Sequence, residues 1–181
     1  MRLFNGIICR VYSIYLKIRF KNKLSIPKKC IVNKDTKILI GSGSIIIGNG
    51  MNARRNLTLS CASGQLIIGS RVHFNINCLV ACRSKIVVED ECIFGPNVCI
   101  YDHDHLFDEN GIDNFSFSYK DVHIGRNCWI GAGAIILKGT DIGEGSIVGA
   151  GTVVKGFIPP HSIVTNNRDL EIRPILKREI I

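Results

Sequence analysis

The chain has 181 residues, of which 46% are hydrophobic and 7% aromatic, and a formal net charge of +8. This length suits one well-buried domain and gives no reason for two. The charge lies at the N-terminus, because the first 30 residues hold eight Lys or Arg and no Asp or Glu, whereas the remainder holds 15 of each sign. The neutral body lacks interleaved basic and aromatic residues, which argues against nucleic-acid binding.

The first predicted element is a basic amphipathic helix within residues 1–30. Arg10 and Lys17 interrupt its apolar run, so it does not predict a membrane span, and no small-residue cleavage site of a signal peptide follows. Two interpretations stay open: a cap on the end of the following domain, or peripheral contact of residues 1–22 with an anionic membrane. The apolar residues of this helix recur at the i, i+3, i+4 spacing of one helix face: Leu3, Phe4, Ile7, Ile8, Val11, Ile14, Tyr15 and Ile18.

A repeat begins after this segment. Residues 34–50 alternate isoleucine with glycine turns, and farther on large apolar residues lie six apart before a two-residue shift to Val88; they are Ile68, Phe74, Val80 and Ile86. Imperfect repeats are usual near the ends of a solenoid.

The eight cysteines form no C-x-x-C pair. Cys92 and Cys128 fall at the small, inward position of their repeats, so we interpret the cysteines as small buried hydrophobic residues. Free thiols of this kind indicate a reducing compartment, the cytoplasm.

The repeat stops at residues 101–122, which form a polar and aromatic insertion containing two of the five histidines and three phenylalanines. A solenoid gains no stability from such an interruption, and long loops in compact domains are usually functional or disordered. We therefore expect the chemistry to lie in this loop.

His103 and His105 flank Asp104 within the loop, and Asp102 precedes them. Alternate residues of an extended chain share a face, so the two imidazoles are expected on the same side. Histidine titrates near pH 6.5, at about the pKa that suits a general base at neutral pH, and a neighbouring carboxylate fixes its tautomer. Asp102 and Asp104 are the candidates for that orienting role, and solvated loop histidines are the alternative interpretation.

From residue 124 to 160 the repeat is regular. A period of six fits neither a helix nor a single strand, and predicts short strands joined by turns, three of which close one triangular coil. The aliphatic residue points into the prism, and successive coils stack as parallel strands. The repeating aliphatics are Ile124, Ile130, Ile136, Ile142, Val148 and Val154, and the small residues four places after them are Cys128, Ala134, Thr140, Ser146 and Thr152.

The rows IGRNCWIGAGA, from Ile124, and IGEGSIVGAGTVV, from Ile142, followed by Ile158-Pro-Pro, resemble the hexapeptide-repeat acyltransferases. Over residues 60–165 the chain is similar to the maltose and galactoside O-acetyltransferases and to capsule, colanic-acid and lipopolysaccharide O-acetyltransferases. The resemblance implies an all-β solenoid, a left-handed parallel β-helix with an N-terminal amphipathic helix and a protruding loop. The implied organisation is an N-terminal cap (1–30), a catalytic β-helix (31–165, with loop 101–122 inserted) and a C-terminal tail or cap (166–181).

The resemblance also implies site residues. A gapless register puts the catalytic histidine at His105, 24 residues before Trp129, with His103 as the second candidate. The same register puts the acceptor-binding asparagine at Asn75, and substrate contacts are also expected from Asp102 and Asp104. No metal is expected. The acetyl-CoA contacts implied are Trp129, Gly131, Ala132, Ala150 and Gly151, with Lys155 and Arg173 for the phosphates.

The function implied by the resemblance is acetyl-CoA-dependent O-acetylation of a sugar hydroxyl, in surface polysaccharide biosynthesis, by direct transfer with a histidine base. The acceptor is a sugar or glycan, and the basic N-terminus leaves a lipid-linked acceptor open. Threefold packing of flat apolar faces implies a homotrimer. The expected location is cytoplasmic, with peripheral contact at the inner face of the membrane left open.

Three alternatives stay open. N-acetylation of a nucleotide amino sugar would use the same histidine. A γ-class carbonic anhydrase shares the prism, but its zinc site needs a His-x4-His strand that the chain lacks. A non-catalytic scaffold is the third alternative.

Overall fold

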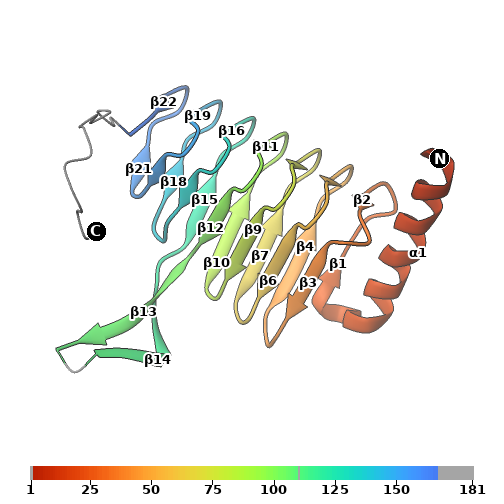
Figure 1. The fold of residues 1–181 in the computed structure, drawn as a ribbon, viewed down its shortest axis with the longest axis horizontal. Coiled ribbons are helices and arrows are strands. Elements are labelled where there is room, and N and C mark those ends of the chain that lie inside the picture. Colours follow the sequence, from red (N-terminus) through yellow and green to blue (C-terminus); the bar gives the residue numbers. More distant parts are fainter. Residues whose placement is uncertain (1, 110, 167–181) are drawn as a thin grey trace, which may run out of the picture.

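The computed structural model describes residues 2–109 and 111–166. Helix α1 (Arg2–Phe20) and the 3-10 turn η1 (Lys21–Lys23) come first, and strands wound into a solenoid follow (Figure 1). Three parallel sheets form the sides of a prism, and a two-stranded hairpin projects from it. This is the left-handed parallel β-helix with an N-terminal helix and a protruding segment that the resemblance implied, so the prediction of the fold class is confirmed.

Each sheet collects every third strand of the solenoid. The first sheet contains, in spatial order, β1 (Leu24–Ser25), β4 (Ser44–Ile47), β7 (Gln65–Ile68), β10 (Lys85–Val88), β15 (Val122–Ile124), β18 (Asp141–Ile142) and β21 (Phe157–Ile158). The second contains β2 (Ile31–Val32), β5 (Asn52–Ala53), β8 (His73–Phe74), β11 (Ile93–Phe94), β16 (Trp129–Ile130), β19 (Ile147–Val148) and β22 (Ile163–Val164). The third contains β3 (Lys37–Ile40), β6 (Thr58–Cys61), β9 (Leu79–Cys82), β12 (Cys99–Tyr101), β17 (Ile135–Ile136) and β20 (Val153–Val154).

The late coils follow the six-residue period closely. Ile124 pairs with Ile142, and Ile130 with Val148, so one coil takes three repeats. The repeating aliphatic residues from 124 to 154 are no more than 2% exposed, and so are the small residues between them. The repeat predicted from the sequence therefore gives the core of this region directly.

The early coils are wider, which explains the apparent slip in their repeat. Strands β7 and β10 have four residues, and two of the four face the interior. Ile86 and Val88 both point inward from β10, so the two-residue shift between them marks a longer strand. Six of the eight cysteines are buried, as the sequence predicts, whereas Cys9 and Cys99 are half-buried.

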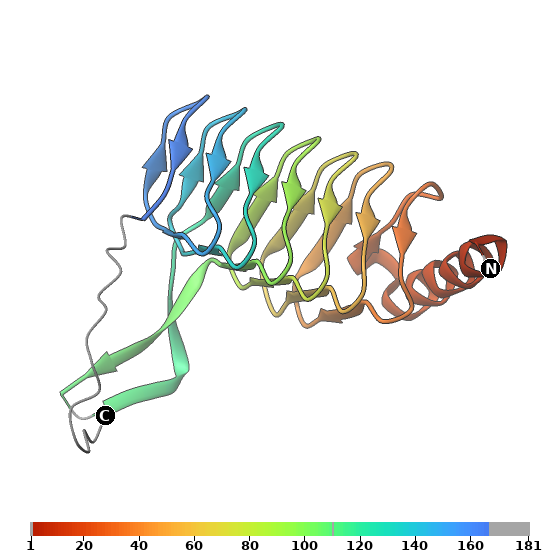
Figure 2. The same ribbon diagram turned by 45° about the horizontal axis from the view of Figure 1, so that its top comes forward.

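Helix α1 lies against the first coil at the N-terminal end of the prism (Figures 1 and 2). It packs through Tyr12, Leu16 and Phe20, and the Tyr12 hydroxyl donates a hydrogen bond of 2.7 Å to the Thr36 carbonyl. The helix thus covers the open end, but not with the face that the apolar spacing predicts. Exposed fractions of 49% to 70% are found instead for Val11, Ile14, Tyr15 and Ile18.

This exposed apolar stripe lies beside basic residues, so peripheral membrane contact through residues 1–22 stays a prediction, which co-sedimentation with anionic vesicles would test. Within the described residues, no helix combines the length and the hydropathy that a bilayer span requires.

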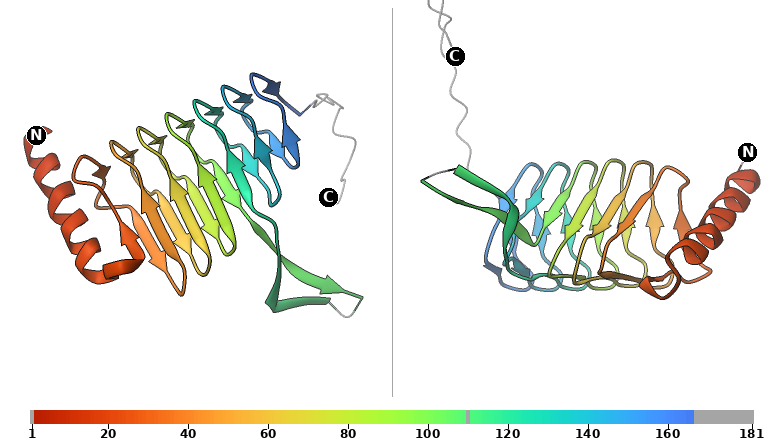
Figure 3. Two further views of the ribbon diagram at one scale, coloured as in Figure 1. Left: turned by 180° about the vertical axis from the view of Figure 1, so that it is seen from behind. Right: turned by 90° about the horizontal axis from the view of Figure 1, so that it is seen from below.

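The insertion of residues 101–122 is an antiparallel hairpin of β13 (His103–Asp108) and β14 (Gly111–Tyr119). It leaves the prism between β12 and β15, near the late coils, as the views from behind and below show (Figure 3). Sequence reasoning expected a loop here, because it could not foresee the pairing of two segments whose side chains are largely exposed.

Two edges of the prism carry most of the residues that the sequence analysis predicts for the site. We call the edge between the third and first sheets the hairpin corner, formed by residues 82–85, 101–103, 119–122, 137–140 and 155–156. We call the edge between the second and third sheets the alanine corner, formed by residues 53–57, 74–78, 94–98, 130–134 and 148–152. The third sheet separates the two corners.

Candidate active site

The hairpin is anchored at its base by one buried carboxylate, that of Asp102. The Asp102 side chain is fully buried, and its oxygens accept hydrogen bonds from the backbone N–H of Arg83 at 2.9 Å and of Ser84 at 2.8 Å. The Lys120 N–H closes the base by donating to the Asp102 carbonyl at 3.0 Å. A carboxylate held by backbone donors has a fixed orientation and resists displacement.

His103 is the histidine that this carboxylate orients. Its Nδ1 lies 2.8 Å from Asp102 Oδ1, and its side chain is 15% exposed. Since the carboxylate can only accept, Nδ1 donates, and the lone pair is left on Nε2. Asp102 therefore occupies the orienting position considered for it, and its burial keeps it from direct contact with a substrate.

His105 lies on the same side of the hairpin, as the alternation of an extended chain predicts. Both imidazoles contact the ring of Phe117, with centroid distances of 5.6 Å for His103 and 4.4 Å for His105. The Nδ1 atom of His105 is 3.3 Å from the Asp113 carbonyl oxygen, and the residue is exposed. Unlike His103, His105 thus forms no hydrogen bond to a carboxylate among the described residues, although its charge adds to the hydrogen bonds that lower the pKa of Asp113.

Three further side chains complete this surface. The Arg83 guanidinium stacks 3.5 Å above the centroid of the Phe117 ring. Asp104, expected near a substrate, forms an ion pair of 2.9 Å with Lys138 from the neighbouring coil. Lys138 also donates to Ser118 Oγ. The site is therefore an aromatic and cationic shelf around two imidazoles.

Asn75 lies on the other edge, the alanine corner. Its Oδ1 accepts a hydrogen bond of 2.9 Å from the N–H of Ile76, and its own N–H donates to the Phe94 carbonyl at 3.1 Å. The neighbouring turns are linked by a ladder of amides from Asn56 to Asn77 at 3.0 Å and from Asn77 to Asn97 at 3.1 Å. One chain therefore does not bring Asn75 next to the histidines.

The residues expected to hold acetyl-CoA divide between the two corners. Trp129 points outward from β16 and is 54% exposed, as predicted. Ala132 and Ala150 are exposed at the alanine corner. Gly131 lies beneath them, where a Cβ would meet the backbone nitrogen of Ala150 at 2.6 Å, so this glycine serves coil stacking.

The remaining cofactor candidates are placed differently. Gly151 has a φ of +66° and donates to the Ala132 carbonyl at 2.7 Å, so it shapes the turn of the alanine corner. Lys155 follows β20 at the hairpin corner, across the third sheet from the alanines. Arg173, with residues 167–181 of the predicted C-terminal tail, lies outside the described residues.

Sequence reasoning missed Arg83, Phe117 and Lys138. The pairing of Ala81 with Tyr101 brings Arg83 beside the base of the hairpin. A signal was present for Arg83, since one coil period of about twenty residues separates it from Asp102. No sequence signal identified Phe117, because its contact with the histidines depends on how the hairpin folds back.

A second carboxylate and histidine cluster lies on the outer face of the first sheet. His123 Nδ1 is 2.7 Å from Asp141 Oδ1, and His123 Nε2 is 3.1 Å from Glu89 Oε1. His123 and Asp141 line a pocket of about 550 Å³, and Lys120 and Asp121 also line it. The cluster joins the coil before the hairpin insertion to the two coils after it.

The His123 cluster predicts a pH-dependent stability. Burial alone lowers the pKa of His123, but hydrogen bonds and charge from Asp141 and Glu89 outweigh burial and raise this pKa. A histidine with a raised pKa stabilises the fold fully below its unfolded-state value of about 6.5, and loses that contribution as the pH rises through the folded-state value. We therefore expect His123→Gln to reduce the free energy of unfolding more at a pH of about 6 than at about 8.

Urea denaturation at the two pH values measures this difference. His161→Gln is the matched control, because that imidazole is 74% exposed and lies 3.9 Å from Glu144. Equal destabilisation by His123→Gln at both pH values would contradict the prediction.

Within residues 2–109 and 111–166, no three His, Cys, Asp or Glu side chains are grouped so that they could hold a metal ion. His103 and His105 both contact the ring of Phe117. Of the acids near them, Asp102 accepts hydrogen bonds from His103 and from backbone N–H groups, and Asp104 pairs with Lys138.

The late coils match a known protein family. Residues 121–156 match the family described as bacterial transferase hexapeptide (six repeats). The match covers the coils in which the structure shows the most regular stacking.

Two curated relatives share part of the chain. A Staphylococcus aureus (strain COL) protein is 48% identical over 54 residues, which are 30% of this chain and 27% of the relative. A Schizosaccharomyces pombe protein is 36% identical over 90 residues, which are 50% of this chain and 44% of the relative. Both are named as acetyltransferases on a provisional basis. The chain spans less than half the length of these two relatives.

Among solved structures, the fold is similar to a mutant of AntD, an N-acyltransferase from Bacillus cereus, in complex with dTDP and coenzyme A. The TM-score is 0.71 with 23% sequence identity, over 90% of this chain and 89% of AntD. At this identity the similarity is one of fold.

Proposed function

We propose that the protein is an acetyl-CoA-dependent acetyltransferase that acetylates a hydroxyl group of a sugar or glycan. The observation that carries the proposal is the contact of His103 with buried Asp102 at the base of the hairpin, beside the hexapeptide coils. Support also comes from the acetyltransferase names of the sequence relatives and from the coenzyme A bound by AntD. Surface polysaccharide biosynthesis and a cytoplasmic location remain expectations from the resemblance.

In the proposed reaction, Nε2 of His103 removes the proton of the acceptor hydroxyl while its oxygen attacks the thioester carbonyl carbon of acetyl-CoA. The tetrahedral intermediate then collapses with cleavage of the carbon–sulfur bond. The His103 imidazolium returns the proton to the departing thiolate, so the products are the acetyl ester and coenzyme A. Asp102 stabilises the imidazolium between these steps and keeps the ring in one tautomer.

His103 and His105 are both candidates for the base, and the two kinds of argument favour different residues. The gapless register of the resemblance favours His105. The geometry favours His103, because His103 alone of the two has a carboxylate at hydrogen-bond distance. In this proposal His105, packed on Phe117, lies where it would contact the acceptor.

We propose further that the site is completed by a second chain in a homotrimer. In one chain the histidines and the alanine corner lie on opposite edges of the third sheet. The outer face of this sheet is apolar along one row, which contains Leu79, Cys99, Ile135 and Val153. Burying such faces by threefold packing would bring the hairpin of one chain to the alanine corner of the next.

The alanine corner is the proposed wall for the pantetheine arm of acetyl-CoA. Ala150→Trp is expected to raise the KM for acetyl-CoA by about tenfold or more, the equivalent of about 1.4 kcal/mol, because the indole would occupy the strip that the arm follows. Ala150 is exposed, so the fold should accept the larger side chain, and thermal unfolding checks this. An unchanged KM would remove Ala150 from the cofactor site.

The same variant tests the shared site. Ala150→Trp chains refolded together with His103→Ala chains should regain part of the activity, since mixed trimers contain clefts with an intact hairpin and an intact alanine corner. Each variant refolded alone is the control. Absence of any gain in the mixture would contradict a site built from two chains.

N-acetylation of a nucleotide amino sugar is the second candidate, favoured by the similarity of fold to AntD, an N-acyltransferase complexed with dTDP. The two products differ in chemistry, because mild alkaline hydroxylamine cleaves an acetyl ester and leaves an acetyl amide intact. A stable acetylated product would therefore favour the N-acetyltransferase.

A further inference from the structure

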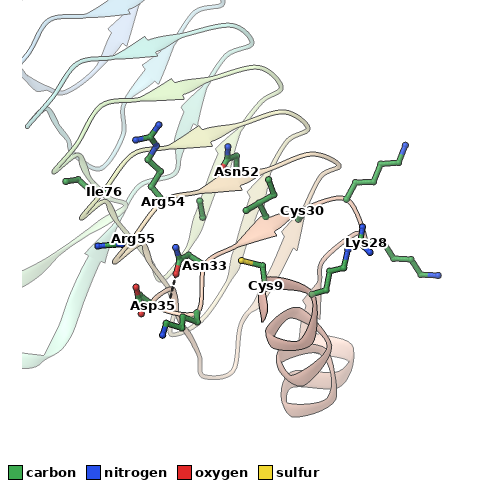
Figure 4. A pocket seen from close by; sticks show the side chains of 14 residues that line it. Cys9, Lys28, Cys30, Asn33, Asp35, Asn52, Arg54, Arg55 and Ile76 are labelled. Atoms are coloured by element: carbon green, nitrogen blue, oxygen red, sulfur yellow. Dashed lines mark hydrogen bonds between the residues drawn. The ribbon is translucent and has the colours of Figure 1, made fainter. Parts of the chain in front are cut away.

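A pocket of about 1080 Å³ opens at the N-terminal end of the prism, between helix α1, residues 28–35 and the turn after β5 (Figure 4). Cys9 and Lys28 stand on the side of the helix, whereas Arg54, Arg55 and Ile76 stand on the side of the central coils (Figure 4). Neither the hairpin nor its histidines take part in this pocket.

The lining is strongly cationic. It contains one carboxylate, that of Asp35, against six basic side chains, those of Arg10, Lys28, Lys29, Lys34, Arg54 and Arg55. All six are exposed, and among the described residues none of them forms an ion pair. Burial, followed by the charge of Arg54, lowers the pKa of neighbouring His73. Six cations and a single carboxylate around one hollow leave a net positive charge that attracts an anion, since a concave surface concentrates their field.

The pocket continues the alanine corner toward the N-terminus. Asn52 pairs with His73 and Ala53 with Phe74, so Arg54 is stacked beside Asn75 in the next coil, and the Arg54 N–H donates to the Phe74 carbonyl at 3.0 Å. Ile76, the residue after Asn75, lines the pocket itself. Along this edge, the first turn contains the basic residues Arg54 and Arg55, and the next contains Asn75. The turns of the late coils contain glycine and alanine.

We infer that this pocket binds the phosphate or diphosphate group of a phosphorylated sugar acceptor. The arginines are suited to the task, because a guanidinium presents paired donors to phosphate oxygens. The sugar of such an acceptor would extend from Arg54 toward Asn75, and acetyl-CoA would approach along the same corner from the other end. The link to the acceptor rests on the proposed acetyltransferase function, whereas the anion site does not.

Isothermal titration calorimetry with inorganic pyrophosphate tests the site without any turnover. Arg54→Gln/Arg55→Gln is expected to raise the Kd for pyrophosphate by about tenfold or more, since two charged donors are lost. Lys85→Gln/Arg126→Gln removes the same charge from exposed positions outside the pocket and should leave the Kd nearly unchanged. Equal weakening by the two double variants, or none by the pocket variant, would overturn the inference; circular dichroism checks that both variants fold.

Two competitors of bound pyrophosphate distinguish the source of the phosphate. One is UDP-N-acetylglucosamine, a soluble diphosphate sugar, and the other is a phosphatidylcholine vesicle containing a polyprenyl diphosphate. Displacement by either supports the inference and identifies the source, whereas displacement by neither overturns it. Displacement without acetyl transfer would leave the site standing and count against the proposed function. In active enzyme, the pocket variant should raise the KM of a phosphorylated acceptor with kcat unchanged, and an equal rise for an uncharged sugar would overturn the link to the acceptor.

Discussion

Replacing His103 with alanine is expected to lower kcat for acetyl transfer by about 100- to 10,000-fold, the range that a positioned general base contributes. His103 is 15% exposed and held at 2.8 Å by Asp102, so the loss removes an oriented base and does not disturb a large packing contact. The folded state should persist, because the imidazole lies at the hairpin base, outside the core of the prism.

Release of coenzyme A thiol from acetyl-CoA, measured against a panel of mono- and oligosaccharides and nucleotide sugars, gives the rate. His105→Ala is the matched control, since that imidazole lies on the same strand and contacts the same phenylalanine, but its Nδ1 faces a backbone carbonyl and not a carboxylate. We expect His105→Ala to change kcat much less and to act mainly on the acceptor KM. A larger loss of kcat in His105→Ala would assign the base to His105, as the register of the resemblance does.

Asp102→Ala is expected to destabilise the fold by about 2–6 kcal/mol, because it removes a buried carboxylate that accepts hydrogen bonds from two backbone N–H groups. The carboxylate is fully buried and accepts from the N–H groups of Arg83 and Ser84, which would be left without this partner. Each unsatisfied buried donor costs about 1–3 kcal/mol. The hairpin base should therefore loosen, and His103 would lose its orientation at the same time.

Urea denaturation of Asp102→Ala and Asp104→Ala measures this effect. Asp104 is the matched control, because its side chain is 52% exposed and Lys138, its partner, keeps a hydrogen bond to Ser118 Oγ when Asp104 is removed. A surface pair of this kind contributes about 0–1 kcal/mol. Similar free energies of unfolding for the two variants would contradict the structural role given to Asp102.

The sequence could not decide which of the two histidines is oriented by a carboxylate. Spacing from Trp129 relates His105 to other proteins, but it carries no information on hydrogen bonding. The contact between His103 and Asp102 depends on the turn after β9, whose N–H groups fix the carboxylate. The N–H groups of Arg83 and Ser84, nineteen and eighteen residues before Asp102, hold its carboxylate in place. Through this carboxylate they make His103 the better oriented of the two imidazoles.

The sequence by itself determined the β-helix, because each six-residue repeat must bury one aliphatic side chain and turn on small residues. The period from Ile124 to Val154 gave the register of the late coils and the outward position of Trp129, and all of these agree with the structure. The interruption after Ile100 also located the insertion that folds as the β13–β14 hairpin. Local periodicity suffices for these features, since every coil contacts only its neighbours.

The tertiary structure decided what local periodicity cannot reach. The hairpin folds on itself, so Phe117 meets both imidazoles although it is twelve or more residues away in sequence. The winding of the chain sends Asn75 and Ala150 to one corner and His103 and Lys155 to another. Helix α1 packs through Tyr12, Leu16 and Phe20 and thereby forms one wall of the cationic pocket. Each of these outcomes depends on which coil lies beside which in space.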